Sequence, residues 1–399
     1  MQIGVFTSAA KPNWGGSYSL QVSLVNSLIK QAKNSKHSFI IVNQLRLKVD
    51  KNNLPINVKI YTPNSKSAIF ILRIFLHLFI EFYNFIKYPG TTFSIKKVYS
   101  KSLLPLGLYK KIDLNWSISP LYLDNGKPFV LTIWDLLYLD FPGLPEISKG
   151  GAWDQLHNHY CRLVLKASRI FVTSSVTKNK LVSVFGCDYK KIDIIPLPFI
   201  ESAHSTNLQD IGNQLDNSKK SEFLLYPAQL WPHKNHRVIL DAIATLKNEL
   251  KLTFVFTGSD KGNLKYLKRE IKKLGIDNYI SFKGFVDAKE FNLLFSQAKA
   301  IVFPSIAEPD NLPAIDSIMS NKLVICADIP GIREQLSDKA FFIDPFDVEG
   351  WANAIKSLQD NTLMPPKMNQ KNEFLTDQDY VKLALVEINQ LEKYIRLWS

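Results

Sequence analysis

Short apolar runs alternate with longer amphipathic segments along most of the chain. The runs are four or five residues long and rich in Val, Ile and Phe, which is typical of strands buried on both faces. The segments between them have the length and periodicity of helices. This alternation predicts parallel α/β sheets. We expect strands at residues 2–6, 38–42, 58–61, 129–133, 169–173, 223–226, 252–256, 279–282, 300–303 and 323–326.

A polar, unperiodic stretch divides this pattern into two halves. The apolar alternation stops near residue 198 and resumes with a strand at 223, so the stretch between them is expected to be a linker or surface loop. The expected parts are an N-terminal Rossmann-like domain at 1–198, a linker at 199–221, a second Rossmann-like domain at 222–365 and a C-terminal helical segment at 366–399. Helices are expected at 16–33, 69–87, 151–166, 176–185, 235–250, 263–273, 287–297, 312–320 and 377–397.

The two halves differ in charge. Residues 1–198 carry 25 Lys and Arg against 10 Asp and Glu, a balance of +15, whereas residues 199–399 carry 24 against 26, a balance of −2. A basic half indicates an anionic partner, such as an acidic membrane surface, a phosphorylated lipid or a nucleic acid. The alternative is a set of solvated lysines. Nucleic acid is the least favoured partner, because the chain has no nucleic-acid-binding motif and no interleaving of basic and aromatic residues.

The expected helix at 69–87 has a single polar stripe on an otherwise apolar surface. Two interpretations are open. The helix packs on a sheet and leaves one edge in water, or it lies in the plane of a membrane or against a lipid acceptor. We expect the first, although periodicity alone does not separate the two. The stripe consists of Arg73, His77, Glu81, Asn84 and Lys87.

Cysteines and the N-terminus indicate a reducing compartment. The three cysteines are far apart and show no metal-binding spacing, so buried single thiols in the cytosol are expected. The first residues lack the basic segment of a signal peptide.

The Asp377-Gln378-Asp379 run precedes the last expected helix and is interpreted as N-terminal capping, not as a metal site.

The strongest chemical signal lies at residues 304–316, which follow an expected strand and open an expected helix. Two carboxylates, Glu308 and Asp316, flank the turn at a spacing of eight residues. Backbone N–H groups at a helix start attract phosphate, and carboxylates accept hydrogen bonds from sugar hydroxyls. In the same half, Lys234 precedes Asn235, which we expect to cap a helix, so that the lysine stands beside a helix start and neutralises a diphosphate.

Glycines follow two more strands of the second half, at Gly258 and at the Gly284-Phe285-Val286 run. They allow the backbone to approach a bound base closely. In an open parallel sheet, ligands bind beyond the carboxyl ends of the strands. The segments at Lys234, Gly258, Gly284 and residues 304–316 all fall at such ends. Each feature alone has a simpler interpretation: most loop lysines are solvated, turn residues cap helices, and Glu308 complements a helix dipole.

Taken in order, these motifs resemble the donor domain of glycosyltransferase family 4, and the resemblance covers nearly the whole chain. It implies a retaining, metal-independent enzyme with the GT-B fold, two Rossmann-like domains facing a cleft, and a C-terminal helix that crosses back to the first domain. The matching features are Gly15-Gly16, Trp134-Asp135, Lys234-Asn235, Gly258, Gly284-Phe285-Val286, Glu308 and Leu312-Pro313.

Three residues depart from the family pattern. Asp316 replaces the second glutamate and is one methylene shorter. Gln229 stands where an arginine often accompanies the lysine, so it brings no charge. Trp134 stands where many members carry histidine, and an indole is not an acid or base.

The resemblance implies a role for each donor-side residue. Lys234 and Gln229 contact the diphosphate, with help from the backbone N–H groups of Asn311 and Leu312. Glu308 holds the hydroxyls of the donor sugar near the reacting carbon. Asp316 accepts hydrogen bonds from the ribose.

On the acceptor side, Gly15 and Gly16 let the first-domain loop approach the donor phosphates. Asp135 orients or deprotonates the acceptor hydroxyl, with Trp134 beside it. Glu308, Lys234 and Asp135 are the expected catalytic residues.

The implied reaction transfers a hexosyl or deoxyhexosyl group from a nucleotide-diphosphate sugar to a glycan or lipid-linked glycan. Bacterial surface polysaccharide synthesis in the cytoplasm, at the acidic inner face of the membrane, is the expected setting. The alternative is a non-catalytic subunit or sugar-nucleotide-binding scaffold of the same fold. A Rossmann oxidoreductase is less favoured, because no GxGxxG follows a strand.

Overall fold

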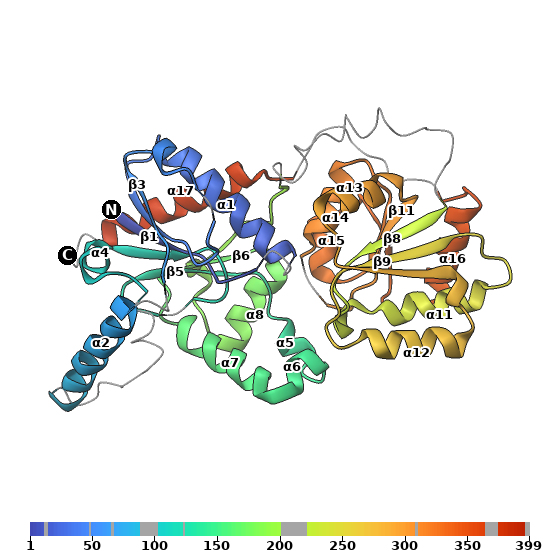
Figure 1. Cartoon of the computed structure of the whole chain (residues 1–399), viewed down its shortest axis with the longest axis horizontal. Helices are drawn as coiled ribbons and strands as arrows, with labels where there is room; N and C mark the ends of the chain where they lie inside the picture. Colours follow the sequence, from blue (N-terminus) through green and yellow to red (C-terminus); the bar gives the residue numbers. More distant parts are fainter. Residues whose placement is uncertain are drawn as a thin grey trace.

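The computed structural model describes residues 1–11, 15–47, 49–64, 68–87, 103–122, 124–200, 222–307, 310–363 and 374–395. Two α/β lobes stand side by side, each built on one parallel sheet (Figure 1). This arrangement confirms the predicted fold class of two Rossmann-like domains, the GT-B architecture.

The N-terminal sheet has seven parallel strands in the order β3-β2-β1-β4-β5-β6-β7. Strand β4 was not expected, because two of its four residues are polar. Its Asn115 is nevertheless fully buried, and its amide donates to the hydroxyl of Tyr122 and to the side-chain oxygen of Asn125. The strands are β1 (Gln2–Phe6), β2 (Ser38–Val42), β3 (Val58–Tyr61), β4 (Leu114–Ser117), β5 (Phe129–Ile133), β6 (Arg169–Val172) and β7 (Ile192–Ile194).

The C-terminal sheet has six parallel strands in the order β10-β9-β8-β11-β12-β13. In both sheets the strand order reverses beside the first strand, which creates a crevice at the carboxyl ends of the two strands that flank the switch point. The strands are β8 (Phe223–Pro227), β9 (Thr253–Thr257), β10 (Ile280–Gly284), β11 (Ala300–Phe303), β12 (Val324–Ala327) and β13 (Phe341–Ile343).

Helices cover both sheets, and those that were expected start or end within a few residues of their expected positions. Those of the N-terminal lobe are α1 (Gly16–Ala32), α2 (Ala68–Lys87), α4 (Leu106–Lys111), α5 (Leu137–Asp140), α6 (Pro145–Ser148), α7 (Ala152–Leu163) and α8 (Ser175–Phe185). Those of the C-terminal lobe are α11 (His236–Leu246), α12 (Leu264–Leu274), α13 (Ala288–Gln297), α14 (Leu312–Met319), α15 (Pro330–Leu336) and α16 (Val348–Gln359). Of these helices, α4, α5, α6, α15 and α16 were not expected.

The last helix, α17 (Asp377–Ile395), crosses back and packs beside α1 on the N-terminal lobe, as expected (Figure 1). Asp377 is buried and accepts a hydrogen bond from the hydroxyl of Ser23. Thr376 and Asp379 form a reciprocal capping box, in which each side chain accepts from the backbone N–H of the other. The Asp-x-Asp run therefore caps and anchors this helix.

Two expectations about side-chain burial are wrong. Cys161 is exposed, although Cys187 and Cys326 are buried. Two residues of the α2 stripe face the protein instead of water: His77 is buried, and Arg73 donates to the hydroxyl of Tyr61 at 3.0 Å, whereas Lys87 at the end of the helix is exposed. The apolar side of α2 is therefore the exposed one. Among the described residues, no helix combines the length and apolarity that crossing a membrane requires.

Candidate functional site

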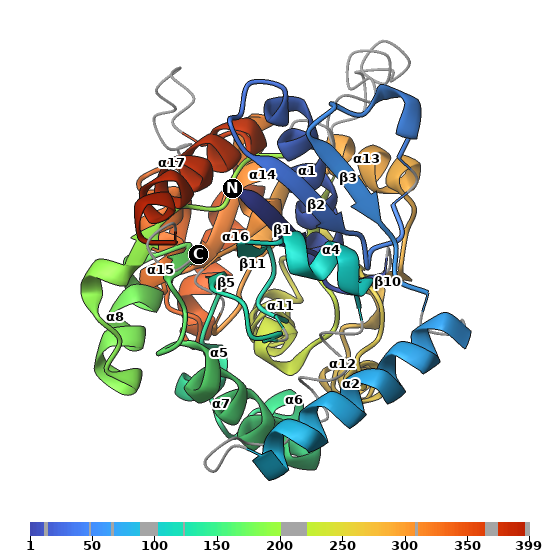
Figure 2. The same cartoon turned by 90° about the vertical axis from the view of Figure 1, so that its left-hand side faces the viewer.

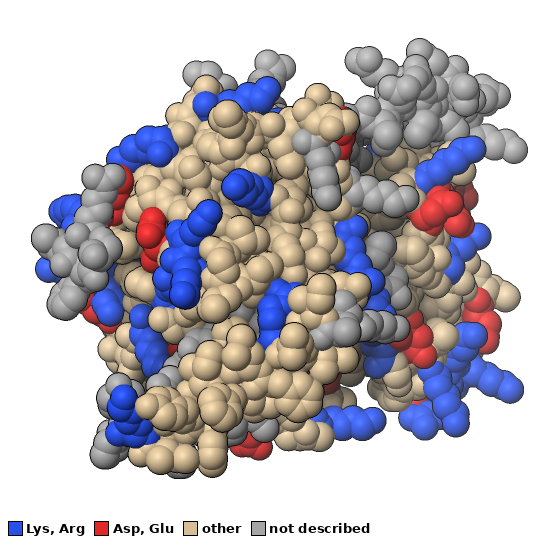
Figure 3. Space-filling model, turned by 60° about the vertical axis from the view of Figure 1, so that its left-hand side comes forward, with Lys and Arg blue, Asp and Glu red and all other residues tan. Residues whose placement is uncertain are grey.

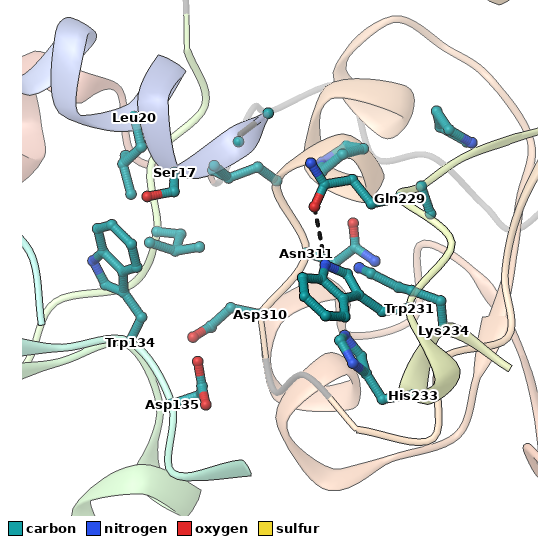
Figure 4. Close-up of a pocket in the computed structure, with 17 residues that line it drawn as sticks. Ser17, Leu20, Trp134, Asp135, Gln229, Trp231, His233, Lys234, Asp310 and Asn311 are labelled. Carbon is teal, nitrogen blue, oxygen red and sulfur yellow. Dashed lines mark hydrogen bonds between the residues drawn. The ribbon is translucent and has the colours of Figure 1, made fainter. Parts of the chain in front are cut away.

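A cavity of about 320 Å³ lies between the two lobes, beyond the carboxyl ends of their sheets. Two helix starts, those of α1 and α14, meet at this cavity, as do the loops after β5 and β8 (Figure 4). This is the position that the strand order of both sheets favours for a ligand. The lining residues are Gly15, Gly16, Ser17, Leu20, Trp134, Asp135, Leu197, Pro227, Ala228, Gln229, Trp231, His233, Lys234, Asp310, Asn311, Leu312 and Pro313.

The first wall is the start of α1. Gly15 has φ 68° and ψ −134°, a conformation that disfavours a residue with a side chain, so its glycine is required by the turn. A Cβ on Gly16 would lie 3.5 Å from a methyl group of Leu312 in the other domain. The buried side chain of Gln21 accepts from the N–H of Ser8 at 2.8 Å and so anchors the loop after β1. The glycine turn therefore lies close to the start of α14.

Trp134 and Asp135 follow β5 and form the floor of the cavity. The Asp135 carboxylate accepts from the N–H of Leu137 at 3.0 Å, which fixes the turn into α5. In Figure 4 the carboxylates of Asp135 and Asp310 point toward each other from opposite domains. The hydroxyl of Thr173 lies within hydrogen-bond distance of both Asp310 and the carbonyl of Trp134. Two acids and a hydroxyl therefore meet where the domains touch.

Lys234 and Gln229 form the opposite wall. Lys234 ends a single 3₁₀ turn, η5 (Pro232–Lys234), and its carbonyl accepts from the hydroxyl of Tyr226 at 2.7 Å. The side-chain oxygen of Gln229 accepts from the indole of Trp231 at 2.9 Å, as the dashed line in Figure 4 shows. That bond fixes the amide orientation and directs its nitrogen away from the indole. Both residues thus come to the cavity from the loop after β8.

Asn235 occupies the N-cap position of α11, as expected, but its side chain does not cap the helix. Its backbone has φ 53° and ψ 40°, a left-handed conformation that asparagine tolerates, and its side chain makes no capping bond. The side-chain amide instead donates to the carbonyls of Pro304 at 3.1 Å and Pro345 at 2.7 Å. Asn235 therefore ties together three loops at the carboxyl end of the sheet, and this network positions the adjacent Lys234.

Asn311 caps α14, because its side chain accepts from the N–H of Ala314 at 3.3 Å. Its own N–H donates to the side chain of Gln335 at 2.9 Å. The expectation that this N–H faces a phosphate is therefore wrong in this conformation. Leu312 lines the cavity too, and its N–H lies in the first turn of the helix.

Several predicted donor residues lie outside the lining of this cavity: Gly258, Gly284, Phe285, Val286 and Asp316. Glu308 lies outside the described residues, so its predicted place in the site stays a prediction. Gly258 affects the cavity indirectly, through the loop after β8. A Cβ there would come within 2.4 Å of the carbonyl oxygen of Ala228, so only glycine lets β9 end against the loop that carries Gln229.

Sequence reasoning missed a hydrogen-bonded Glu–His pair between the domains. The side chain of Glu146, on α6, accepts from the backbone N–H of His233 at 3.1 Å and from its ring nitrogen at 2.7 Å. Burial opposes ionisation of Glu146, but the His233 ring and backbone N–H outweigh it and hold the pKa of Glu146 below its usual range. The two residues are 87 positions apart, so no local pattern indicates the pair. Asp310, which lines the cavity from the C-terminal domain, was missed as well.

Glu146→Gln is expected to destabilise the contact between the domains by about 1–3 kcal/mol at pH 7, because it removes the charge from a buried hydrogen-bonded pair. A carboxylate with a lowered pKa stabilises above its ordinary pKa, and the contribution disappears as the pH falls through the folded value. Thermal unfolding should therefore separate the variant from the parent at pH 7, and the difference should shrink as the pH falls below the ordinary carboxyl pKa. Glu349→Gln, on an exposed turn of α16, is the control, and an equal shift there would contradict the assignment.

Comparison with known proteins adds to this geometry. Residues 209–373 match the family model described as Glycosyl transferases group 1. This match supports the interpretation of the chain as a glycosyltransferase. The match covers the C-terminal domain, which carries Lys234, Gln229 and the start of α14.

Two curated relatives act on bacterial glycans by their names. The chain is 26% identical over 226 residues to the O-antigen chain mannosyltransferase RfbU of Salmonella typhimurium, which covers 55% of this chain and 60% of that protein. It is 27% identical over 225 residues, 55% of this chain and 58% of the relative, to the N-acetylgalactosamine-N,N'-diacetylbacillosaminyl-diphospho-undecaprenol 4-alpha-N-acetylgalactosaminyltransferase of Campylobacter jejuni. The chain thus spans about 60% of the length of these relatives.

A similar solved structure is that of Anabaena Alr3699/HepE in complex with UDP and glucose. The TM-score is 0.59 at 17% identity, and the likeness covers 100% of both chains. At this identity the likeness establishes the two-domain fold.

Proposed function

We propose that this chain is a retaining glycosyltransferase of family 4. It transfers a hexosyl or deoxyhexosyl group from a nucleotide-diphosphate sugar to a hydroxyl of a glycan or lipid-linked glycan. The observation that carries the proposal is the interdomain cavity, where Lys234 and the starts of α1 and α14 face one another. A cation and two helix N-termini form a site that attracts a diphosphate.

The comparisons support both substrates of this reaction. The similar Anabaena structure holds UDP and glucose, and the Campylobacter relative is named for a diphospho-undecaprenol acceptor. The Salmonella relative is named for O-antigen chain synthesis. By analogy, we place this chain in the synthesis of a bacterial surface polysaccharide, in the cytoplasm and at the inner face of the membrane.

The proposed chemistry centres on the leaving diphosphate. As the bond from the sugar to the diphosphate breaks, negative charge grows on the diphosphate oxygens. Lys234 would stabilise that charge, with the N–H of Leu312 and the amide of Gln229 as hydrogen-bond donors, and this stabilisation is largest in the transition state. Positive charge supplied by the protein makes a metal ion unnecessary in this scheme. Glu308 would hold donor-sugar hydroxyls, and Asp316 would meet the ribose.

The acceptor would enter from the N-terminal side, over Trp134. Asp135 would orient or deprotonate the attacking hydroxyl, which requires that its carboxylate face the reacting carbon. The neighbouring Asp310 comes from the donor domain, so the pair would bring the acceptor group and the donor together only when the domains are in contact.

Calorimetric titration with UDP, GDP, ADP, dTDP and their hexose and deoxyhexose conjugates tests the proposal. One nucleotide sugar should bind, and a matching lipid-linked glycan should be extended with retention at the anomeric carbon. Asp135→Asn is expected to keep donor affinity and to lose turnover by roughly 10²-fold or more.

The outcomes separate the alternatives. Donor binding without turnover on any glycan acceptor would favour a sugar-nucleotide-binding scaffold. Full turnover by Asp135→Asn would remove that residue from the chemistry. No binding of any nucleotide sugar would overturn the proposal itself.

A further inference from the structure

Helix α2 turns its apolar side toward solvent. Its exposed face is about half the circumference of the helix and contains four aromatic and six aliphatic side chains. Phe79 and Leu72, near the middle of that face, are 72% and 69% exposed. The helix projects from the N-terminal lobe below β3, on the side away from α17 (Figures 1 and 2). The exposed large residues are Ile69, Ile71, Leu72, Phe75, Leu76, Phe79, Ile80, Phe82, Tyr83 and Ile86.

The orientation of α2 is fixed by contacts on its other side. Phe70 and His77 are buried, and the guanidinium of Arg73 donates to the hydroxyl of Tyr61 on β3. Phe70, Arg73 and His77 are separated by three and four residues, so they share one face of the helix. These three residues therefore attach α2 to the domain, and the exposed apolar face cannot be buried by a simple rotation without breaking their contacts.

The sequence on both sides of α2 is basic. Residues 59–127, which contain α2 and the segments on either side of it, hold ten Lys and Arg against three Asp and Glu. In the space-filling view, Lys and Arg stand around and beside an uncharged area at the position of α2 (Figure 3). Among them, Lys87 ends the helix, and Lys110 and Lys111 end the nearby α4. An apolar face bordered by cations matches the interface of a bilayer that contains anionic lipids.

We propose that α2 lies flat in the surface of an anionic bilayer and docks the N-terminal lobe on it. Its 20 residues form a rod of about 30 Å, which inserts its aromatic and aliphatic side chains among the upper acyl chains. The lysines next to it stay at the level of the phosphates. A second copy of the chain is a poorer occupant, because the same basic segment would face itself across a symmetric contact.

This docking goes beyond the proposed transfer reaction, because it needs neither donor nor acceptor. It also has a consequence for that reaction. A helix bound in the bilayer surface would hold the N-terminal half of the cleft near lipid-linked molecules. The protein would then meet its acceptor by diffusion within the plane of the membrane.

Vesicle flotation of the full chain tests the proposal, with lipid vesicles of phosphatidylcholine alone and of phosphatidylcholine with 30% phosphatidylglycerol. The parent protein should float with the anionic vesicles and far less with the neutral ones, and 0.5 M NaCl should weaken the binding. Phe75→Glu/Phe79→Glu should reduce the bound fraction at least tenfold. The matched control, Phe346→Glu/Val386→Glu, adds the same charge at exposed apolar positions on the other lobe and on α17, and should bind like the parent.

Size-exclusion chromatography with light scattering, without vesicles, completes the test. A monomer that floats through α2 supports the proposal. A parent dimer that Phe75→Glu/Phe79→Glu converts to monomer would identify a contact between copies and overturn it, as would flotation that both double variants retain. Circular dichroism at 25 °C checks that the variants are folded. Because no sugar nucleotide is present, failure here leaves the transfer proposal standing, and the reverse also holds.

Discussion

Lys234→Ala is expected to lower turnover by roughly 10²–10³-fold, the loss typical of removing a group that stabilises charge only in the transition state. The lysine comes from a short 3₁₀ turn at the cavity wall, on a loop held by Tyr226 and Asn235. The loss should fall mainly on turnover and less on donor affinity, because the diphosphate gains charge as the sugar leaves.

Steady-state kinetics with the nucleotide sugar that binds in calorimetry would measure this effect. Lys234→Arg keeps the charge and should retain more activity than Lys234→Ala. Lys265→Ala removes a lysine from the exposed surface of α12 and is the matched control. The role of Lys234 would be contradicted by unchanged turnover in Lys234→Ala, or by an equal loss in the Lys265→Ala control.

His236→Phe is expected to remove much of the acid sensitivity of the C-terminal domain. The His236 ring is buried against Tyr226, and neither ring nitrogen has a hydrogen-bond partner among the described residues. Burial, with smaller contributions from the charges of Lys234 and His233, lowers the pKa of His236 to about 3. The ring is therefore neutral in the folded protein at pH 7.

The sign of the pH effect follows from that lowered pKa. The unfolded chain takes up a proton on this histidine as the pH falls below about 6.5, whereas the folded protein does so only near 3. The contribution of the neutral His236 ring to the free energy of unfolding is therefore fully present above pH 6.5 and is lost as the pH falls toward 3. Near pH 4.5 the loss is roughly 2–3 kcal/mol at 1.36 kcal/mol per unit.

Urea unfolding of the parent and of His236→Phe at pH 7 and pH 4.5 would measure this loss of stability. His236→Phe should equal or exceed the parent at pH 7, because phenylalanine fills the same apolar site without a buried, unpaired nitrogen. At pH 4.5 it should be more stable than the parent by roughly 2–3 kcal/mol. His159→Phe, at a partly buried ring that contacts the carbonyl of Pro120, is the control. Parallel acid sensitivity in parent and His236→Phe would show that His236 is not the group responsible.

The loops around the cavity show why some site residues could be predicted and others could not. Lys234 and Leu312 were predicted because each follows a strand and precedes a helix, and a parallel sheet brings such segments to one edge. Glu146, His233 and Asp310 were missed as a cross-domain set, because their contacts depend on how two separately folded lobes meet. Asn235 shows the same limit on a smaller scale: its residue type favours a cap, but two proline carbonyls hold its side chain instead.

The sequence by itself determined the two parallel sheets, the division near residue 200, the return of the last helix by way of family resemblance, and the loops that could carry chemistry. Apart from the return of the last helix, these follow from local periodicity and from the geometry of parallel strands, which are properties of each segment and its neighbours. Only the tertiary structure decided which loops line one cavity, which acids face across it, and that α2 presents its apolar side outward. Those outcomes depend on contacts such as Arg73 with Tyr61 and Glu146 with His233, between segments that no periodicity relates.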